Sequence, residues 1–494
     1  MSATPASSYN PSRSLLAVIA VIIVAGIVLR FLAITPTWIH YDENYYLNIG
    51  VNFIEHGELT PYMWRLDPDS NIIAGSGTGY GVLLLTWWQA LFGVTLVGVR
   101  VLMVLVGLTT AAMMYFVGAV WWSSRAAGVA TAIVAVVSTS PFYSYLARMD
   151  ALGMLSYSVA LLLHVLAVRR NSRWLHFATG VAVVATAEFH ILGVLYLAGI
   201  TLYMGIVYLR DVIAEKRLAL NHEAIFYGVG GLMAGLVYIA VHILPDPAAY
   251  FVISNECFQC SGTSLQKEMT RWTRFGVLRG LEVPLLVIGL VSVLSRRSEE
   301  DWHYLAVFGG WLVALSLAGP PPFTHYTYHV WPLVALGVGG FIARGFQRGG
   351  TLRQWRVSTG LTFALFMLIA NYGLHLLGFQ PFELRSDTEY ADHAEGIAFI
   401  HANIPTDTVI MSDVLLFHPL KDYTEFMSYR NGYEYGAGRE GVPILDYWQV
   451  QRPLVIVGGW RDEDADLDQY MTGVGFEEVT PGTWVAIELL DETG

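Results

Sequence analysis

Long apolar segments constrain this chain more than any other feature. A helix needs about 20 mostly apolar residues to cross the hydrocarbon core of a bilayer. The chain is 54% hydrophobic and 14% charged, and its mean hydropathy is +0.49. Apolar segments occur at 14–34, 96–120, 126–141, 151–168, 174–188, 190–209, 223–244, 275–294, 302–318, 326–345 and 356–377. The sequence therefore predicts a polytopic α-helical membrane protein with about eleven transmembrane helices.

The basic residues between these segments predict the orientation. Short cytoplasmic loops of membrane proteins carry an excess of Lys and Arg. With the N-terminus inside, every second connection is cytoplasmic, and those connections hold Arg125, Arg169, Arg170, Arg173, Arg210, Lys216, Arg217, Arg296, Arg297, Arg344, Arg348, Arg353 and Arg356. We expect a multi-pass cell-membrane protein with a cytoplasmic N-terminus, whose first helix is a retained signal anchor.

The composition changes after the last apolar segment. Residues 379–494 contain 22 acidic and 6 basic side chains, so the formal charge of −12 comes from this region. This balance argues against binding to nucleic acid, which needs a basic surface. Asp392–Ala402 has a helical pattern, whereas Thr408–Met411, Leu454–Val457 and Trp484–Leu489 have strand patterns. We expect a transmembrane domain at 1–378 and a small extracytoplasmic α/β domain at 379–494.

The first extracytoplasmic loop, at 35–95, begins with the run His40-Tyr-Asp-Glu-Asn-Tyr-Tyr46. From Asp42 the pattern predicts a helix to His56, ended by Gly57, whose apolar face rests on the membrane surface. Its polar face carries Asn44, Asn48, Asn52 and Glu55, and its apolar face carries Tyr45, Tyr46, Ile49 and Phe53. Asp42 is either a helix N-cap, with Glu43 favoured by the helix dipole, or part of an active site.

These residues resemble a known group of enzymes. An Asp-Glu pair after the first transmembrane helix, followed by aromatics, is similar to the GT-C glycosyltransferases of the protein O-mannosyltransferase and lipid A aminoarabinose transferase group. Ser140–Asp150, with its Arg148 and Asp150, resembles the second outer loop of that group. The chain departs from the pattern at Gly77-Thr-Gly-Tyr-Gly81, where relatives often have His-Pro-Pro-Leu. A Trp-Trp-Asp-type motif is missing from its tail, which disfavours transfer to an Asn side chain.

The resemblance implies a reaction. The donor would be a sugar on a polyprenyl phosphate, dolichyl or undecaprenyl, held in membrane lipid. The acceptor would be a hydroxyl of a protein, a lipid or a glycan on the extracytoplasmic side. Asp42 would act as the general base in a displacement that inverts the anomeric carbon. Glu43 would orient the acceptor or support Asp42.

A leaving lipid phosphate needs positive charge or hydrogen-bond donors around it. Arg148 is the first candidate, although it could instead pair with Asp150 or extend to the membrane interface. Further candidates for substrate contact on the outer side are Tyr46, Asp150, His190, Arg271, Arg274, His325, Tyr326 and His329. For the His325–His329 cluster the alternative is an interfacial belt. Glu188 and His190 either line a cavity or lie in a wet turn.

We expect no required metal cofactor. If a divalent cation were bound by the paired carboxylates and loop oxygens, Mg²⁺ or Mn²⁺ would suit them better than zinc. Asp67-Pro68-Asp69 fits a turn better than a metal site. The run Asp462–Asp466 fits a solvated loop better than a cation site. Cys257 and Cys260 predict a local disulfide in an oxidising compartment, the alternatives being a redox pair or half of a zinc site.

Two other functions remain open from the sequence. A transporter or lipid-carrier flippase would also have many helices and intramembrane charges. The ionisable residues gather at the outer helix ends rather than at mid-membrane, which favours an enzyme. An inactive relative with a binding tail would predict that substitution of Asp42 changes nothing.

Overall fold

In the computed structural model, the chain divides into two compact units. It describes residues 13–32, 34, 41–59, 79–137, 146, 148–190, 193–215, 221–245, 247, 269, 273, 283–295, 298–318, 329–348, 362, 366, 370, 393–412, 416–423, 425–429, 443–458 and 465–493. The first unit comprises residues 1–34, 74–81 and 100–380, and the second comprises 35–73, 82–99 and 381–494.

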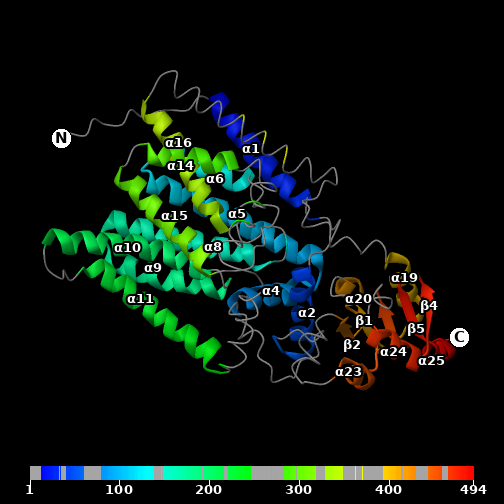
Figure 1. The fold of residues 1–494 in the computed structure, drawn as a ribbon. Coiled ribbons are helices and arrows are strands. Elements are labelled where there is room, and N and C mark those ends of the chain that lie inside the picture. Colours follow the sequence, from blue (N-terminus) through cyan, green and yellow to red (C-terminus); the bar gives the residue numbers. More distant parts are fainter. Residues whose placement is uncertain are drawn as a thin grey trace. The chain divides into compact units, whose positions relative to one another are not determined.

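The first unit is helical (Figure 1). Its elements are α1 (Arg13–Leu32), most of α5 (Leu96–Trp121), α6 (Arg125–Val137), α8 (Met149–Arg170), α9 (Arg173–Ala185), the 3₁₀ turn η2 (Thr186–Glu188), α10 (Gly193–Glu215), α11 (His222–Tyr238), the π-helical turn η3 (Ile239–Ile243), α14 (Val283–Leu294), α15 (Glu299–Ala318) and α16 (Trp331–Arg348). Each predicted transmembrane segment up to 326–345 therefore contains a helix.

Five of these helical segments are long and apolar enough to cross a membrane: Arg13–Leu32, Leu96–Trp121, Met149–Arg170, Leu195–Ala214 and His222–Ile243. Shorter apolar helices occur at Arg125–Val136, Val283–Leu294 and Trp331–Ile342. Their positions agree with the predicted segments, and the count of eleven stays a prediction. Of the last predicted segment, 356–377, only Thr362, Phe366 and Ala370 belong to the described residues.

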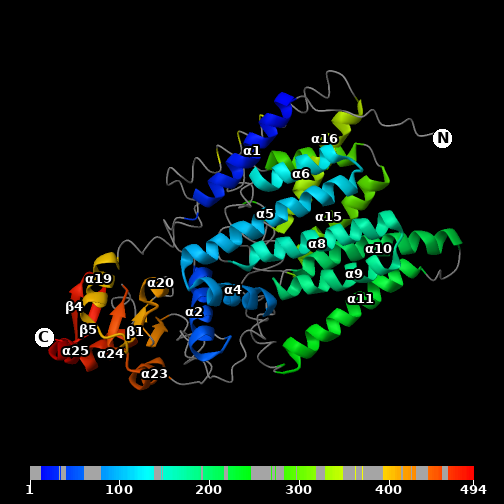
Figure 2. The same ribbon diagram turned by 180° about the vertical axis from the view of Figure 1, so that it is seen from behind.

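Helices of the first unit pack in pairs. The most extensive contacts join α9 with α11, α10 with α15, α6 with α16, α14 with α16 and α8 with α9. The two opposite views agree that α8, α9 and α10 lie side by side (Figures 1 and 2). Buried polar groups also link them. Arg30 Nη2 in α1 donates to the Ala135 carbonyl of α6 at 2.9 Å. Trp122 Nε1, after α5, donates to the Leu336 carbonyl of α16 at 2.8 Å.

The crossing of α9 and α11 depends on small residues. A Cβ built at Gly180 would lie 2.1 Å from the carbonyl oxygen of Tyr227, and one at Gly230 would lie 2.2 Å from that of Phe177. The two backbones therefore approach each other more closely than any larger residue allows. Small residues at helix crossings permit such packing in membrane proteins.

The second unit includes the helix that begins the first loop. Helix α2 (Tyr41–His56) ends before Gly57, whose φ of 77° is easy only for glycine, and these bounds confirm the predicted helix. It packs against α20 (Phe417–Leu420) of the same unit. Most of α4 (Gly79–Phe92) also belongs to this unit. This helix lies within the predicted first loop, 35–95, and was not predicted as a helix. Gln89 Nε2 of α4 donates to the Tyr46 carbonyl at 3.1 Å.

The polar face of α2 is largely buried. Asn44, Asn48 and Asn52 are buried, with at most 3% of each exposed, whereas Tyr45 and Tyr46 are half-buried. The amide face therefore lies inside the protein, not against water. Helical periodicity shows which residues share a face, but it does not show where buried side-chain amides find polar surroundings.

The rest of the second unit is a five-stranded sheet with helices on both faces (Figure 1). The strands are β1 (Val409–Ser412), β2 (Glu425–Ser428), β3 (Val455–Val457), β4 (Phe476–Thr480) and β5 (Thr483–Ala486), in the spatial order β2-β1-β3-β5-β4. β2, β1 and β3 are parallel, and β5 and β4 form an antiparallel hairpin beside β3. The helices are α19 (Ala394–Asn403), α20, α23 (Ile444–Gln451), α24 (Ala465–Val474) and α25 (Ile487–Thr493).

Alternation along β1 explains the two covered faces. Met411 joins Trp448 of α23 and Met471 of α24 in one buried cluster. On the opposite side of the strand, Ile410 is also fully buried, and the Phe417 ring of α20 lies 5.2 Å from that of Phe426 in β2. The predicted helix at 392–402 and the predicted strands at 408–411 and 454–457 are confirmed within one or two residues. The predicted strand at 484–489 is only half correct, because α25 begins at Ile487.

Candidate functional site

The best-defined polar cluster surrounds the start of α8. Arg148 is the N-cap residue of α8, with extended backbone angles (φ −119°, ψ 150°), and Asp150 lies in the first turn, where the helix dipole favours a carboxylate. Arg148 Nε donates to Asp150 Oδ2 at 2.8 Å. Both side chains are buried, with 6% and 1% exposed. The predicted alternative, that Arg148 pairs with Asp150, is what the structure has.

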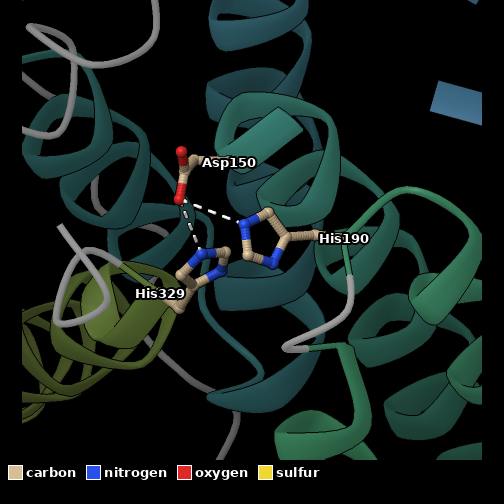
Figure 3. Close-up of side chains that lie close together, drawn as sticks. All are labelled: Asp150, His190 and His329. Atoms are coloured by element: carbon tan, nitrogen blue, oxygen red, sulfur yellow. Dashed lines mark hydrogen bonds and ion pairs between the residues drawn. The ribbon is translucent and has the colours of Figure 1, made fainter. Parts of the chain in front are cut away.

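Two histidines complete this cluster, which we call the Asp150 cluster: Arg148, Asp150, His190 and His329. Figure 3 shows both imidazoles directed at one carboxylate oxygen. His329 Nε2 lies 3.0 Å and His190 Nε2 lies 3.4 Å from Asp150 Oδ1. His190 is 8% exposed and His329 is fully buried. The cluster therefore brings together residues that lie up to 181 positions apart.

Local structure positions each histidine. His190 follows the turn η2, where its backbone N–H donates to the Thr186 carbonyl at 3.0 Å. His329 precedes α16, and its Nδ1 lies 2.8 Å from the Tyr196 hydroxyl of α10. That hydroxyl also donates to the His329 carbonyl at 3.0 Å. Tyr196 itself is stacked on Tyr157 of α8, with the ring centroids 3.5 Å apart. The orientation of His329 is thus fixed by two further helices.

Tyr196 was not predicted from the sequence. Nothing in its surroundings in the apolar segment 190–209 marks it as a polar contact, because a tyrosine there usually only packs. Its partner His329 lies 133 positions away. A contact of that separation has no local signal.

A second buried pair joins Glu188 of η2 to His242 of η3. His242 Nε2 lies 2.8 Å from Glu188 Oε2, and the two residues are 4% and 7% exposed. Glu188 is therefore paired inside the helical unit rather than lying in a wet turn. His242 lies in a π-helical turn, a local widening that is frequent at functional sites. His242 lies in the predicted membrane segment 223–244, and an ionisable residue in such a segment is a functional signal that is visible in the sequence.

The predicted catalytic pair lies in the second unit. α2 begins at Tyr41, so Asp42 and Glu43 lie in its first turn, and Asp42 is not the residue that precedes the helix. Asp42 is partly buried, and Glu43 is fully buried. The Tyr46 ring lies 5.1 Å from that of Tyr45. The role of Asp42 and Glu43 in catalysis stays a prediction.

Several predicted residues lie outside the described part of the chain. They are Asp67, Asp69, Ser140, Cys257, Cys260, Arg271, Arg274, His325, Tyr326 and Asp462. The predictions made for them, including the disulfide, stay predictions.

A metal ion has a suitable set of ligands in the Asp150 cluster. Among the described residues, Asp150, His190 and His329 offer one carboxylate oxygen and two imidazole nitrogens that lie within 4.8 Å of one another. Carboxylate and imidazole are both ligands of divalent transition metals.

Comparison with known proteins supports the fold. No protein-family model matches the chain, and no curated protein matches it in sequence. Solved structures do match it. ArnT from Cupriavidus metallidurans, bound to undecaprenyl phosphate, superimposes with a TM-score of 0.63 at 14% identity, covering 95% of this chain and 98% of ArnT. ArnT in the apo state superimposes with a TM-score of 0.62.

A second group of matches comes from an archaeon. The oligosaccharyltransferase AglB from Archaeoglobus fulgidus, in complex with an inhibitory peptide and a dolichol-phosphate, superimposes with a TM-score of 0.55 at 13% identity, covering 96% of this chain and 74% of AglB. ArnT is a lipid A aminoarabinose transferase, and both proteins are GT-C glycosyltransferases. This chain therefore has the GT-C fold, as its resemblance to that group implied.

Proposed function

We propose that the protein is a membrane glycosyltransferase that moves a sugar from a polyprenyl phosphate to an acceptor hydroxyl on the extracytoplasmic side. The observation that carries this proposal is the Asp150 cluster, a buried group of four ionisable side chains within a GT-C fold. Ionisable groups inside a membrane protein are costly, and they are usually functional. Structures with this fold include ArnT with undecaprenyl phosphate and AglB with a dolichol-phosphate.

The proposed reaction is a direct displacement. The acceptor oxygen forms a bond to the anomeric carbon while the bond from that carbon to the phosphate oxygen breaks. The electron pair leaves with the polyprenyl phosphate, and the hydroxyl proton passes to Asp42. Attack opposite the leaving group inverts the anomeric configuration. A general base of this kind contributes roughly 10²–10⁴-fold to the rate.

The other predicted residues have supporting roles in this proposal. The Asp150 cluster holds the negative charge that develops on the lipid phosphate, with Arg148 as its fixed cation. Asp150 keeps Arg148 and the two histidines in place through the contacts to its two oxygens. Glu43 orients the acceptor or supports Asp42. Tyr46, His325 and Tyr326 contact the substrate.

The proposal is tested by sugar transfer in proteoliposomes. The purified protein is supplied with a panel of polyprenyl phosphate sugars and acceptors, and wild type is compared with Asp42→Asn. This nearly isosteric change removes the base, so we expect turnover to fall roughly 10²–10⁴-fold while donor binding is retained. Asp422→Asn is the matched control, because Asp422 is an exposed acid beside Lys421 in the second unit, where Asp42 also lies.

The outcomes separate the possible functions. Loss of turnover in Asp42→Asn alone, with folding intact, supports both the reaction and the role of Asp42. Equal activity of both variants reduces Asp42 to a residue that stabilises α2. If wild type transfers no sugar from any donor, a transporter or flippase becomes the better explanation.

A further inference from the structure

The contacts around His329 limit where its ring proton can lie. The Tyr196 hydroxyl has one proton, and it lies 3.0 Å from the His329 carbonyl and 2.8 Å from His329 Nδ1. If the hydroxyl donates to Nδ1, the ring proton lies on Nε2 and points at Asp150. If it donates to the carbonyl, Nδ1 is the N–H donor and the neutral ring has a lone pair on Nε2.

In the second case the lone pair faces a carboxylate. His329 Nε2 lies 3.0 Å from Asp150 Oδ1, which also offers only lone pairs when ionised. Two acceptors at this distance repel each other unless a cation lies between them or the ring itself is charged. The cation is either a second proton on His329 or a metal ion that both atoms bind.

His190 favours the metal ion. Its Nε2 is directed at the same Asp150 oxygen as His329 Nε2, from a distance of 3.4 Å, which is long for a hydrogen bond. Zinc–ligand bonds of about 2.0–2.1 Å in a tetrahedron keep neighbouring ligand atoms about 3.3 Å apart. The two separations from Asp150 Oδ1, 3.0 and 3.4 Å, bracket this spacing, whereas the three ligand atoms together lie within 4.8 Å of one another.

The surroundings have the features of a metal site. Ligating histidines commonly donate their other N–H to a neighbouring oxygen, which fixes the ring, and the Tyr196 hydroxyl is such an oxygen, 2.8 Å from His329 Nδ1. Arg148 holds the other oxygen of Asp150. Gly153, one turn after Asp150 on α8, leaves room for both rings, because a Cβ there would lie 2.9 Å from Cβ of His190 and 3.4 Å from Cε1 of His329.

The donor set indicates the kind of metal. One carboxylate oxygen and two imidazole nitrogens suit zinc and similar transition metals, whereas Mg²⁺ prefers oxygen ligands only. Three protein ligands leave a fourth position for a water or an anion. A divalent ion, the Asp150 carboxylate and the Arg148 guanidinium sum to a positive charge, which favours an anion at that position.

We propose that Asp150, His190 and His329 bind one zinc-class divalent metal ion. A role of this ion in holding the lipid phosphate rests on the function proposed above, whereas the metal site itself does not. Carboxylates and loop oxygens alone, the ligands considered from the sequence, favour Mg²⁺ or Mn²⁺, whereas the two imidazoles favour zinc.

Metal content is the first measurement. The full-length protein is purified through a tag without histidines, and bound metal is counted by mass spectrometry before and after dialysis against a chelator and reloading with Zn²⁺ or Co²⁺. We expect about one ion per chain in wild type. The Co²⁺ form should absorb in the visible range with the intensity of a four-coordinate site, a signal that does not depend on sugar transfer.

Two variants and a control identify the ligands. His190→Gln and His329→Gln should each lower the affinity at least tenfold and abolish the Co²⁺ band. His164→Gln should retain both, although His164 Nε2 also faces another histidine, His303, at 2.7 Å. This spacing is too short for two ligands of one ion.

The results separate this proposal from the proposed function. Stoichiometric metal that depends on His190 and His329 supports the site even if no sugar is transferred. Wild-type protein that binds no stoichiometric metal after reloading overturns the site and leaves His329 as a hydrogen-bond donor to Asp150 through Nε2, even if transfer occurs. Metal that persists unchanged in both variants overturns the assignment of the ligands.

Discussion

At the residue scale, Asp150 is surrounded by charge partners. Its carboxylate accepts from Arg148 through one oxygen and faces two imidazoles through the other. Removing one partner of a buried ion pair typically costs about 3–5 kcal/mol, because the remaining charge stays buried. The stability of the first unit should therefore depend on keeping Arg148 and Asp150 together.

Arg148→Met is predicted to lower stability by about 3–5 kcal/mol, because it leaves the buried carboxylate without its guanidinium. Thermal unfolding of the protein in detergent measures the effect. Arg148→Met combined with Asp150→Asn should recover part of the loss, because no lone charge remains. An equal or larger loss in the double variant would contradict the pairing as the cause.

The members of the Asp150 cluster were predictable one by one, but the cluster was not. Arg148 and Asp150 are two positions apart, so their pairing was already a sequence-based alternative. His190 and His329 were identified as outer-side candidates from their place at helix ends. Their convergence on one oxygen depends on how α8, α10 and α16 pack. The role of Tyr196 had no local signal.

At the element scale, the crossing of α9 and α11 rests on glycines. Gly180 and Gly230 bring backbone against backbone, so a methyl group at either position must separate the helices. Overpacking of this kind typically costs about 1–3 kcal/mol. α11 also carries Gly228, around which a Cβ would meet nothing within 4 Å.

Gly230→Ala is therefore predicted to destabilise the protein by about 1–3 kcal/mol, whereas Gly228→Ala should not. The two variants make the same chemical change two positions apart on one helix, which makes them a matched pair. Thermal unfolding in detergent again provides the comparison. Equal stabilities would show that the α9–α11 contact is looser than the structure has it.

Long apolar helices were easier to predict than short elements such as α4, β5 and α25. The apolar segments gave the positions of the long helices because a span needs a long uniform run. α4 was missed because its apolar stretch is short and lies inside a loop otherwise rich in polar residues. The segment 484–489 was read as one strand because a short apolar run does not distinguish strand from helix. The chain changes from β5 to α25 inside it.

At the scale of the whole molecule, the layout was predictable and the grouping was not. The order of a signal anchor, an Asp-Glu loop, many helices and a tail was sufficient to indicate a GT-C fold. The compact second unit joins residues 35–73 and 82–99 with 381–494. Sequence alone separates these stretches by hundreds of positions and offers no pattern that links them.

The orientation in the membrane is a property of the whole molecule. In a background without Cys257 and Cys260, we expect Thr472→Cys, on an exposed position of α24, to react with a membrane-impermeant maleimide in intact cells. Arg125→Cys, exposed at the start of α6 in a predicted cytoplasmic connection, should react only after the membrane is opened. The reverse pattern of labelling would invert the predicted topology.

The short distance in sequence between Arg148 and Asp150 also matters while the chain is being made. A lone carboxylate at the end of a transmembrane helix is costly to bury. Arg148 is only two positions from Asp150, so the two residues leave the ribosome almost together. His190 and His329 follow much later. The segment that becomes α8 can therefore enter the membrane with Arg148 and Asp150 already paired and without net charge between them. The histidines can join this pair as later helices are inserted.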